Sequence, residues 1–274
     1  MNDIVSGNFA PRRLQLWPPQ SLRVVNWNID RGLHLPEIAD FIASQNADLL
    51  ILQEVDVNAR RTDYLNVAEE LACRLGMNYV FGREFEELTQ GSRTSPAYHG
   101  QAVLSRWRLK NARVIRFVAQ SGFWRPRWFL PRTAPFQERL GGRIALVTEI
   151  DVMGKSFVVY DLHLESRGSR DLRLAQLAEV LDDAATSRIA AILGGDLNFD
   201  VSQGPGAVLL QRAGFRSVFG LSRVYTRPAH NFLSNPRSID WAFVSGPLEA
   251  SHAKVHSTVN ASDHYPISFT LRLF

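Results

Sequence analysis

The chain contains the stretch Ile189-Ala190-Ala191-Ile192-Leu193-Gly194-Gly195-Asp196-Leu197-Asn198, in which an apolar run gives way to two glycines and then to polar residues. Such a run is typical of a buried strand, and a packed scaffold can hold polar groups at the rim where the strand ends. The segment Ser262-Asp263-His264 has the same character and stands directly before the last apolar segment. Both segments indicate polar side chains gathered at strand ends.

Four further segments repeat this arrangement. They are Trp27-Asn28, Leu52-Gln53-Glu54, His163 and Ile239-Asp240, and each brings an acid, an amide or an imidazole to the place where an apolar run stops. One carboxylate in such a place means little. The set of six segments indicates one shared chemical site.

Apolar periodicity predicts alternating strands and helices at first, and then mostly strands. We expect helices at 35–43, 65–75, 170–185 and 208–213, and strands at 22–28, 48–55, 78–85, 101–105, 113–118, 144–152, 156–162, 190–193, 239–244, 253–257 and 267–273. Two strand-rich halves flanked by helices predict an α/β fold, a four-layer α/β/β/α sandwich of two packed mixed β-sheets with helices outside. We expect an N-terminal extension at 1–21 and a single domain at 22–274.

Composition narrows the class of protein. The 45% apolar content suffices for a sizeable core. The single cysteine, Cys73, excludes an intrachain disulfide, suggests a reduced compartment, and is expected to be a small buried side chain. No stretch approaches the roughly 20 apolar residues of a membrane span, and the first residues lack the apolar core of a signal peptide. We expect a soluble, cytoplasmic monomer without an obligate protein partner.

Basic residues are unevenly placed. From Trp107 to Arg143 there are nine basic residues and one acid, in a chain with a net charge of +4, which predicts a basic platform beside an acidic body. Prolines and aromatic residues break any periodicity there, so we expect a loop at about 119–142. Its run Phe123-Trp124-Arg125-Pro126-Arg127-Trp128-Phe129 is suited to stacking bases and neutralising phosphates, to meeting a lipid surface, or to packing over the body.

Carboxylates at four strand ends predict a pocket with excess negative charge, which favours a hard cation. Mg²⁺ takes one or two carboxylates and keeps several waters, so Glu54 is the first choice of ligand, with Asn28, Asp240 or Asp263 nearby. The seven histidines form no His-Glu-x-x-His pattern, and there are no cysteine pairs, which argues against zinc. The absence of a Gly-x-Ser-x-Gly elbow argues against a serine nucleophile.

The order of the polar segments resembles that of the endonuclease/exonuclease/phosphatase superfamily, which has the DNase I-like fold. The resemblance runs from about Leu22 to Phe274 and implies a Mg²⁺- or Mn²⁺-dependent phosphoesterase. It implies that Glu54 holds the metal with Asn28 and Asp263, and that Asp196 orients or deprotonates the attacking water. It further implies that Asn198 and His163 hold the phosphate, that Asp240 supports the metal or a histidine, and that Asp263 orients His264. Whether Asp196 or His264 is the base stays open.

Local motifs refine the resemblance. Gly195-Asp196-Leu197-Asn198 lacks the preceding Trp of inositol polyphosphate 5-phosphatases, and Ser238-Ile239-Asp240-Trp241 lacks their Cys-Asp-Arg. Trp27-Asn28-Ile29-Asp30 and His163-Leu164-Glu165-Ser166-Arg167 are similar to tyrosyl-DNA phosphodiesterase 2. We therefore expect a phosphodiesterase acting on nucleic acid, with Trp124, Arg125, Arg127, Trp128 and Arg167 in contact with substrate. A phospholipid phosphodiesterase of the sphingomyelinase type, a small-phosphoester phosphatase and a non-catalytic binding protein are the alternatives.

Overall fold

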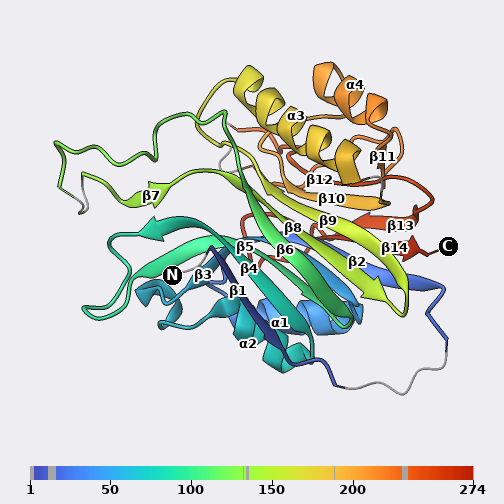
Figure 1. Ribbon diagram of the computed structural model, residues 1–274, viewed down its shortest axis with the longest axis horizontal. Coiled ribbons are helices and arrows are strands. Elements are labelled where there is room, and N and C mark those ends of the chain that lie inside the picture. Colours follow the sequence, from blue (N-terminus) through green and yellow to red (C-terminus); the bar gives the residue numbers. More distant parts are fainter. Residues whose placement is uncertain are drawn as a thin grey trace.

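The protein is described by a computed structural model that covers residues 3–11, 17–131, 133, 136–187, 189–229 and 234–273. Two β-sheets pack face to face, and helices lie on the outer face of each sheet (Figure 1). The predicted four-layer sandwich is confirmed.

The larger sheet has eight strands in the order β1-β4-β5-β3-β2-β14-β13, with β7 paired to β4. The strands are β1 (Ile4–Asn8), β2 (Ser21–Arg31), β3 (Leu49–Val57), β4 (Asn78–Glu87), β5 (Ala97–Ser105), β7 (Arg139–Gly141), β13 (Glu249–Val255) and β14 (Ile267–Arg272). Only the β2–β3 pair among these is parallel, so the described sheet is mixed. Helices α1 (Leu35–Gln45) and α2 (Val67–Leu75) cover it, and a 3-10 turn, η1 (Arg60–Thr62), follows β3.

The smaller sheet has six strands in the order β11-β12-β10-β9-β8-β6. The strands are β6 (Arg108–Arg116), β8 (Ile144–Val152), β9 (Lys155–His163), β10 (Ala191–Asp196), β11 (Arg216–Ser217) and β12 (Asp240–Val244). Strands β9 and β10 run parallel, so this sheet is mixed as well. Helices α3 (Arg170–Ser187) and α4 (Pro205–Arg212) lie on its outer face.

Buried apolar side chains form three layers that match this architecture. One layer joins α1 and α2 to the larger sheet through residues such as Ile38 and Leu71. The second lies between the sheets, where Ile51 and Ile192 are fully buried, and the third joins the smaller sheet to α3 through Leu177. No described helix is both long and apolar enough to cross a membrane.

Several details differ from the sequence-based expectations. Residues 4–8 of the expected extension form β1, which pairs antiparallel with β4. Short, partly buried strands such as β1, β7 and β11 were not predicted because they show too few periods to stand out. Cys73 is exposed, because the buried face of α2 is formed by Val67, Ala68, Leu71 and Ala72; the prediction of a buried cysteine is wrong.

The expected basic platform is also wrong for most of its residues. Many of the basic side chains from Trp107 to Arg143 pair with acids and therefore present no free charge. The described pairs are Lys110–Asp151, Arg113–Asp183, Arg116–Asp3, Arg139–Glu87 and Arg143–Glu84. Sequence counting could not show this, because every partner outside the segment comes from a distant part of the chain.

Candidate active site

Strand pairing in the smaller sheet brings three of the expected polar residues together. Asp196 ends β10 and lies in register with His163 at the end of the parallel strand β9 and with Asp240 at the start of the antiparallel strand β12. The preceding Gly195 has φ 144°, and a Cβ there would meet the carbonyl oxygen of Leu162 at 1.9 Å. Only glycine allows β9 and β10 to approach this closely beside the site.

The larger sheet contributes Glu54 and Asn28 from the other side. The register between β3 and β5 shifts between Leu52 and Val55, and Glu54 within this bulge has φ 52°. Bulges re-aim a side chain, and non-glycine residues at positive φ are frequent at functional sites. The Asn28 amide donates to Glu54 Oε1 and to Asp196 Oδ2, both at 3.3 Å, and so links the sheets.

His264 is held by Asp240 rather than by its neighbour Asp263. Its Nδ1 lies 2.9 Å from both oxygens of Asp240, whereas Nε2 is 3.9 Å from Asp263. The backbone of His264 is anchored too, because the Trp27 indole donates to its carbonyl at 2.8 Å. The predicted orienting role of Asp263 is therefore corrected, and of the two roles foreseen for Asp240 the structure shows support of a histidine.

Asp196 stands between the two imidazoles. Its Oδ2 lies 3.7 Å from His163 Nε2 and 3.8 Å from His264 Nε2, while its Oδ1 accepts from the backbone amide of Asn198 at 2.8 Å. Asn198 has φ 57°, a conformation that asparagine tolerates, and its side-chain amide donates to the Leu164 carbonyl. All four residues are buried.

Electrostatics favour opposite charges in this pocket. Burial by itself lowers the pKa of His264, but Asp240 and Asp196 outweigh it and raise the pKa to about 9. Burial alone raises the pKa of Glu54, but His99 and His163 help to hold it below its ordinary value. The pocket therefore holds an imidazolium and an ionised carboxylate at neutral pH.

The donor set fits a hard divalent cation. Glu54 and Asp196 present carboxylate oxygens on either side of the Asn28 amide nitrogen, while the Asn28 oxygen accepts from the backbone amide of Asp30. Oxygen ligands are what Mg²⁺ and Mn²⁺ prefer. Burial and the nearby Glu54 and Asp263 carboxylates raise the pKa of Asp30, even though Arg31 opposes the shift. A bound cation would relieve this crowding of carboxylates. Asp263 lies at the half-exposed rim and pairs with Arg227.

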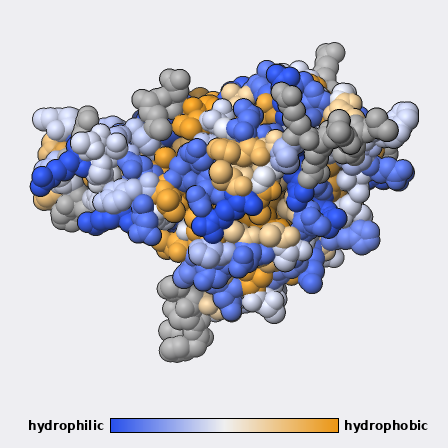
Figure 2. All heavy atoms as spheres, turned by 90° about the horizontal axis from the view of Figure 1, so that it is seen from below, coloured by the Kyte–Doolittle hydropathy of each residue, from blue (hydrophilic) through white to orange (hydrophobic). Residues whose placement is uncertain are grey.

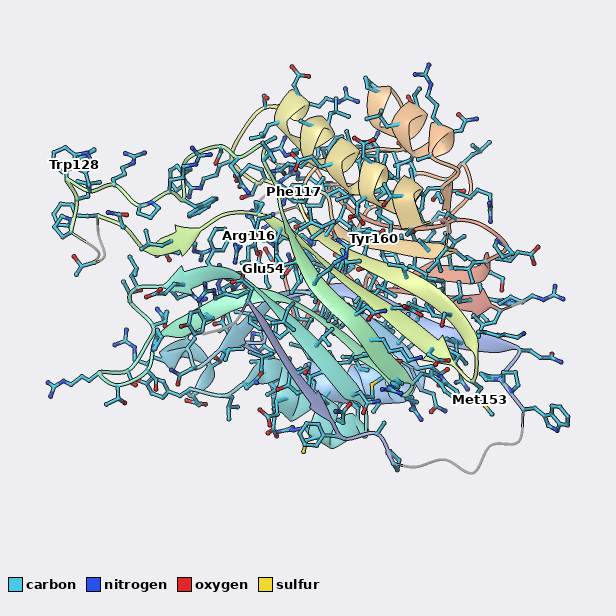
Figure 3. The ribbon with its side chains drawn as sticks, in the orientation of Figure 1. Glu54, Arg116, Phe117, Trp128, Met153 and Tyr160 are labelled. Atoms are coloured by element: carbon cyan, nitrogen blue, oxygen red, sulfur yellow. The ribbon has the colours of Figure 1, made fainter. Side chains whose placement is uncertain are left out.

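The structure separates the loop residues that were grouped as substrate contacts. Trp124 is 8% exposed and packs on Phe85, whereas Trp128 is 94% exposed at the end of the projecting loop (Figure 3). Arg125 and Arg127 are exposed. The projecting part of the molecule formed by this loop carries hydrophilic side chains on its surface (Figure 2, left). Arg167 lies over the Phe123 ring at 4.3 Å.

A cavity of about 230 Å³ lies beneath this loop, with Arg125, Arg139 and Arg167 among its lining residues. The Trp124 indole donates to Glu165, and Arg143 lies 4.0 Å from the same carboxylate. Because Arg143 also pairs with Glu84, which faces His163, the loop connects to the pocket through a chain of side chains.

Three residues beside the pocket make contacts that the sequence did not indicate. Gln53 joins the sheets by donating to Asn26 and, at 2.6 Å, to Asp161. Arg31 lies 3.8 Å from Glu54, and Glu84 lies 3.6 Å from His163 Nδ1. Glu84 and Gln53 lie within strand-like runs. A polar residue at a position expected to be buried was the feature of the sequence that could have indicated their roles.

The family to which the chain belongs follows from its sequence. The model of the Endonuclease/Exonuclease/phosphatase family matches residues 25–264, a span that contains all the strand-end residues described above. The chain belongs to this family. Membership makes it a hydrolase of the phosphoesterase type, and the resemblance predicted from the motifs is confirmed.

Individual relatives agree with this assignment. The chain is 27% identical to the uncharacterized protein YbhP of Escherichia coli K12, over 92% of this chain and 97% of YbhP. The endonuclease/exonuclease/phosphatase structure from Beutenbergia cavernae has a TM-score of 0.68 at 21% identity, covering 93% of this chain and 72% of that one. A humanized D. rerio TDP2 has a TM-score of 0.61 at 17% identity, covering 93% and 100%. These structures support the DNase I-like fold.

Proposed function

We propose that the protein is a divalent-metal-dependent phosphodiesterase that acts on nucleic acid. The observation that carries the proposal is the position of Asp196, with His163 on one side, His264 on the other, and Glu54 joined to it through Asn28. This arrangement offers a base, two nitrogen donors for phosphate oxygens and a carboxylate for a cation within one pocket.

The charges in the pocket favour Asp196 as the base. His264 is protonated at neutral pH because Asp240 raises its pKa to about 9, so it is suited to donating to a phosphate oxygen. Asp196 then accepts the proton of the attacking water. The new P–O bond forms as the bond to the ester oxygen breaks, and that oxygen leaves with the electron pair.

Glu54 and Asn28 would hold the metal, Mg²⁺ or Mn²⁺, with Asp263 at the rim. When bound, such a cation supplies charge neutralisation for the phosphate. A positioned base contributes about 10²- to 10⁴-fold, which is less than phosphoester hydrolysis requires, so charge stabilisation must supply the remainder.

The choice of nucleic acid is supported by the loop beside the pocket. Exposed Arg125, Arg127 and Arg167 offer forked donors to phosphates, and exposed Trp128 offers a face on which a base can stack. The likeness to TDP2 structures agrees with this choice.

A phospholipid substrate is the second candidate, because exposed aromatic side chains also enter membrane surfaces. Trp128, Phe129 and Phe136 are 94%, 62% and 56% exposed in the same loop.

A substrate panel tests both candidates. Single- and double-stranded DNA, RNA, a 5′-phosphotyrosyl oligonucleotide and sphingomyelin vesicles are incubated with Mg²⁺ or Mn²⁺ and wild-type protein, Glu54→Gln or Glu37→Gln. Glu37 is an exposed acid of α1 and serves as the control. We expect turnover of an oligonucleotide that falls at least 10²-fold in Glu54→Gln and is unchanged in Glu37→Gln. Turnover of sphingomyelin alone would reject nucleic acid as the substrate, and activity that survives Glu54→Gln would reject the site.

A further inference from the structure

A second cluster of ligand-type side chains lies between the two sheets, behind the catalytic pocket. Glu84 comes from β4, His99 from β5 and His163 from β9, and the three side chains are at most 2% exposed. One ligand atom from each lies within 4.8 Å of the others. Glu84 reaches this position because the register of β4 shifts between Arg83 and Phe85.

Three buried atoms of this cluster lack a hydrogen-bond partner among the residues that the structure describes: Glu84 Oε2, His99 Nε2 and His163 Nδ1. Leaving a buried polar atom unpaired costs about 1–3 kcal/mol, so three that share one position indicate a missing partner. The other oxygen of Glu84 is already bonded to Arg143 at 2.7 Å.

The remaining contacts show which ring nitrogens lie beside a carboxylate. His99 Nδ1 lies 2.9 Å from Asp56, whose carboxylate also binds Arg61, so this nitrogen carries the proton. His163 Nε2 faces Asp196 at 3.7 Å and Glu54 at 4.0 Å, whereas its Nδ1 faces Glu84 Oε2 at 3.6 Å, so both ring nitrogens lie beside carboxylates. His99 Nε2 therefore turns a lone pair toward Glu84, and His163 Nδ1 does the same once its proton has been released.

Metal ligands bind in their deprotonated form, so a metal ion here would displace the proton between His163 Nδ1 and Glu84 Oε2 and would also bind the free His99 Nε2. We propose that Glu84, His99 and His163 form a second metal site, distinct from the Glu54 site, that takes Zn²⁺ or a similar transition-metal ion. Two imidazoles and one carboxylate are a known zinc ligand set. The 3.6 Å between His163 Nδ1 and Glu84 Oε2 is close to the spacing of about 3.4 Å that bonds of 2.0–2.1 Å give around a tetrahedral ion.

The surroundings of His99 fit this role. A histidine that binds a metal usually donates its other N–H to a carboxylate, and Asp56 provides that carboxylate for His99. Asp56 is in turn fixed by Arg61, at 2.6 Å and 2.9 Å. Sequence spacing argued against zinc because the two histidines lie on strands of different sheets and form no local pattern.

The second site would also affect the first one. A metal bound to Nδ1 of His163 keeps the proton on Nε2, which points into the catalytic pocket toward Asp196. His163 then serves as a fixed donor toward a phosphate oxygen. The proposal itself does not depend on the reaction, because the second metal can be measured without substrate.

Metal binding is tested on the full chain after removal of bound metal with a chelator. One equivalent of Zn²⁺ is added, unbound metal is removed by gel filtration, and the retained zinc is measured by mass spectrometry. We expect wild type, Glu54→Gln and the exposed control His252→Gln to retain one equivalent. His99→Gln should bind zinc at least tenfold more weakly. Equal affinity in His99→Gln, loss of zinc in Glu54→Gln, or no zinc retained by wild type would overturn the proposal.

X-ray absorption of the wild-type zinc complex keeps the test valid if His99→Gln does not fold. The proposed site gives two imidazole ligands, whereas the cluster of Asp196, Asp240 and His264 gives one. A spectrum with two imidazoles supports the second site, and a spectrum with one or none rejects it.

Discussion

His264 shows how a single contact defines the chemistry of a residue. Asp240 accepts from its Nδ1, and the pKa of about 9 exceeds the ordinary 6.5 because Asp240 and Asp196 outweigh burial. A raised pKa means that the folded state binds the proton more tightly. The stabilisation from this pair is full below about pH 6.5 and is lost as the pH rises through about 9.

Removing the Asp240 charge should therefore lower this pKa. In metal-free Asp240→Asn we expect the pKa of His264 to move toward 6.5, as followed by NMR of the ring protons. Phosphodiesterase activity should fall about 10²- to 10⁴-fold, because the imidazole loses its charge and its orientation. Asp263→Asn serves as the comparison, since Asp263 lies 3.9 Å from Nε2. A larger pKa change in Asp263→Asn than in Asp240→Asn would contradict the assignment.

Asp161, unlike His264, destabilises the folded state at neutral pH. It is fully buried, its Oδ1 accepts from Gln53, and burial raises its pKa well above the ordinary 3.8. The folded state keeps the proton that the unfolded state releases, so the free energy of unfolding falls as the pH rises above about 4.

Asp161→Asn should remove this loss while keeping the acceptor for Gln53. We expect the free energy of unfolding at pH 7 to rise by about 1 kcal/mol or more, measured by urea denaturation, with little change at pH 4. Asp151→Asn provides a control of opposite sign, because Lys110 and the Gly154 amide lower the pKa of that partly buried acid. An increased free energy of unfolding at pH 7 in Asp151→Asn, or an unchanged one in Asp161→Asn, would contradict the raised pKa of Asp161.

At the scale of the element, the loop at about 119–142 combines a buried anchor with an exposed end. Trp124 packs on Phe85 with ring centroids 5.1 Å apart and donates to Glu165, whereas Trp128 makes its ring contact with the neighbouring Phe129. One tryptophan of the loop is therefore a buried anchor and the other is exposed. The alternation of aromatic and basic residues in the sequence could not distinguish these two roles.

Two matched substitutions test this division. Trp124→Ala should lower the free energy of unfolding by about 3–5 kcal/mol, because a large buried side chain is lost. Trp128→Ala should change it by less than about 0.5 kcal/mol, yet weaken single-stranded oligonucleotide binding by about 1–3 kcal/mol if a base stacks there. Thermal unfolding and fluorescence anisotropy measure the two effects. Unchanged oligonucleotide affinity in Trp128→Ala would remove this residue from the proposed substrate surface.

At the scale of the whole molecule, the net charge of +4 overstates the basic surface that is available to a substrate. Internal ion pairs occupy Arg139 and Arg143, whose side chains are 9% and 4% exposed. Arg125, Arg127 and Arg167, by contrast, are exposed.

Because few exposed basic side chains are available, the affinity for nucleic acid should depend only moderately on salt concentration. With three phosphate contacts to a single strand, the association constant should fall about tenfold or somewhat more between 50 and 200 mM salt. Arg125→Gln combined with Arg127→Gln should flatten this dependence, whereas Arg108→Gln on the exposed edge of β6 should not. Titrations at several salt concentrations measure the slope. An equal slope for all variants would place the nucleic acid elsewhere.

The sequence by itself determined the layers and the list of polar residues. Strand and helix periodicity is local, so the pattern from Leu22 onward predicted two sheets with helices outside. Polar residues at the ends of apolar runs predicted Asn28, Glu54, Asp196 and His264, because a buried strand can present such groups only where it leaves the core. Short strands such as β1 and β7 were not predicted, because so few residues show little periodicity.

The tertiary structure alone decided which side chains meet. Asp240 rather than the adjacent Asp263 holds His264, because neighbouring residues in an extended or turning chain point in different directions. Bulges turn Glu54 and Glu84 toward the space between the sheets, and the stacking of β5 on β9 brings His99 close to His163. Contacts between distant strands depend on register and sheet packing, which no local pattern in the chain encodes.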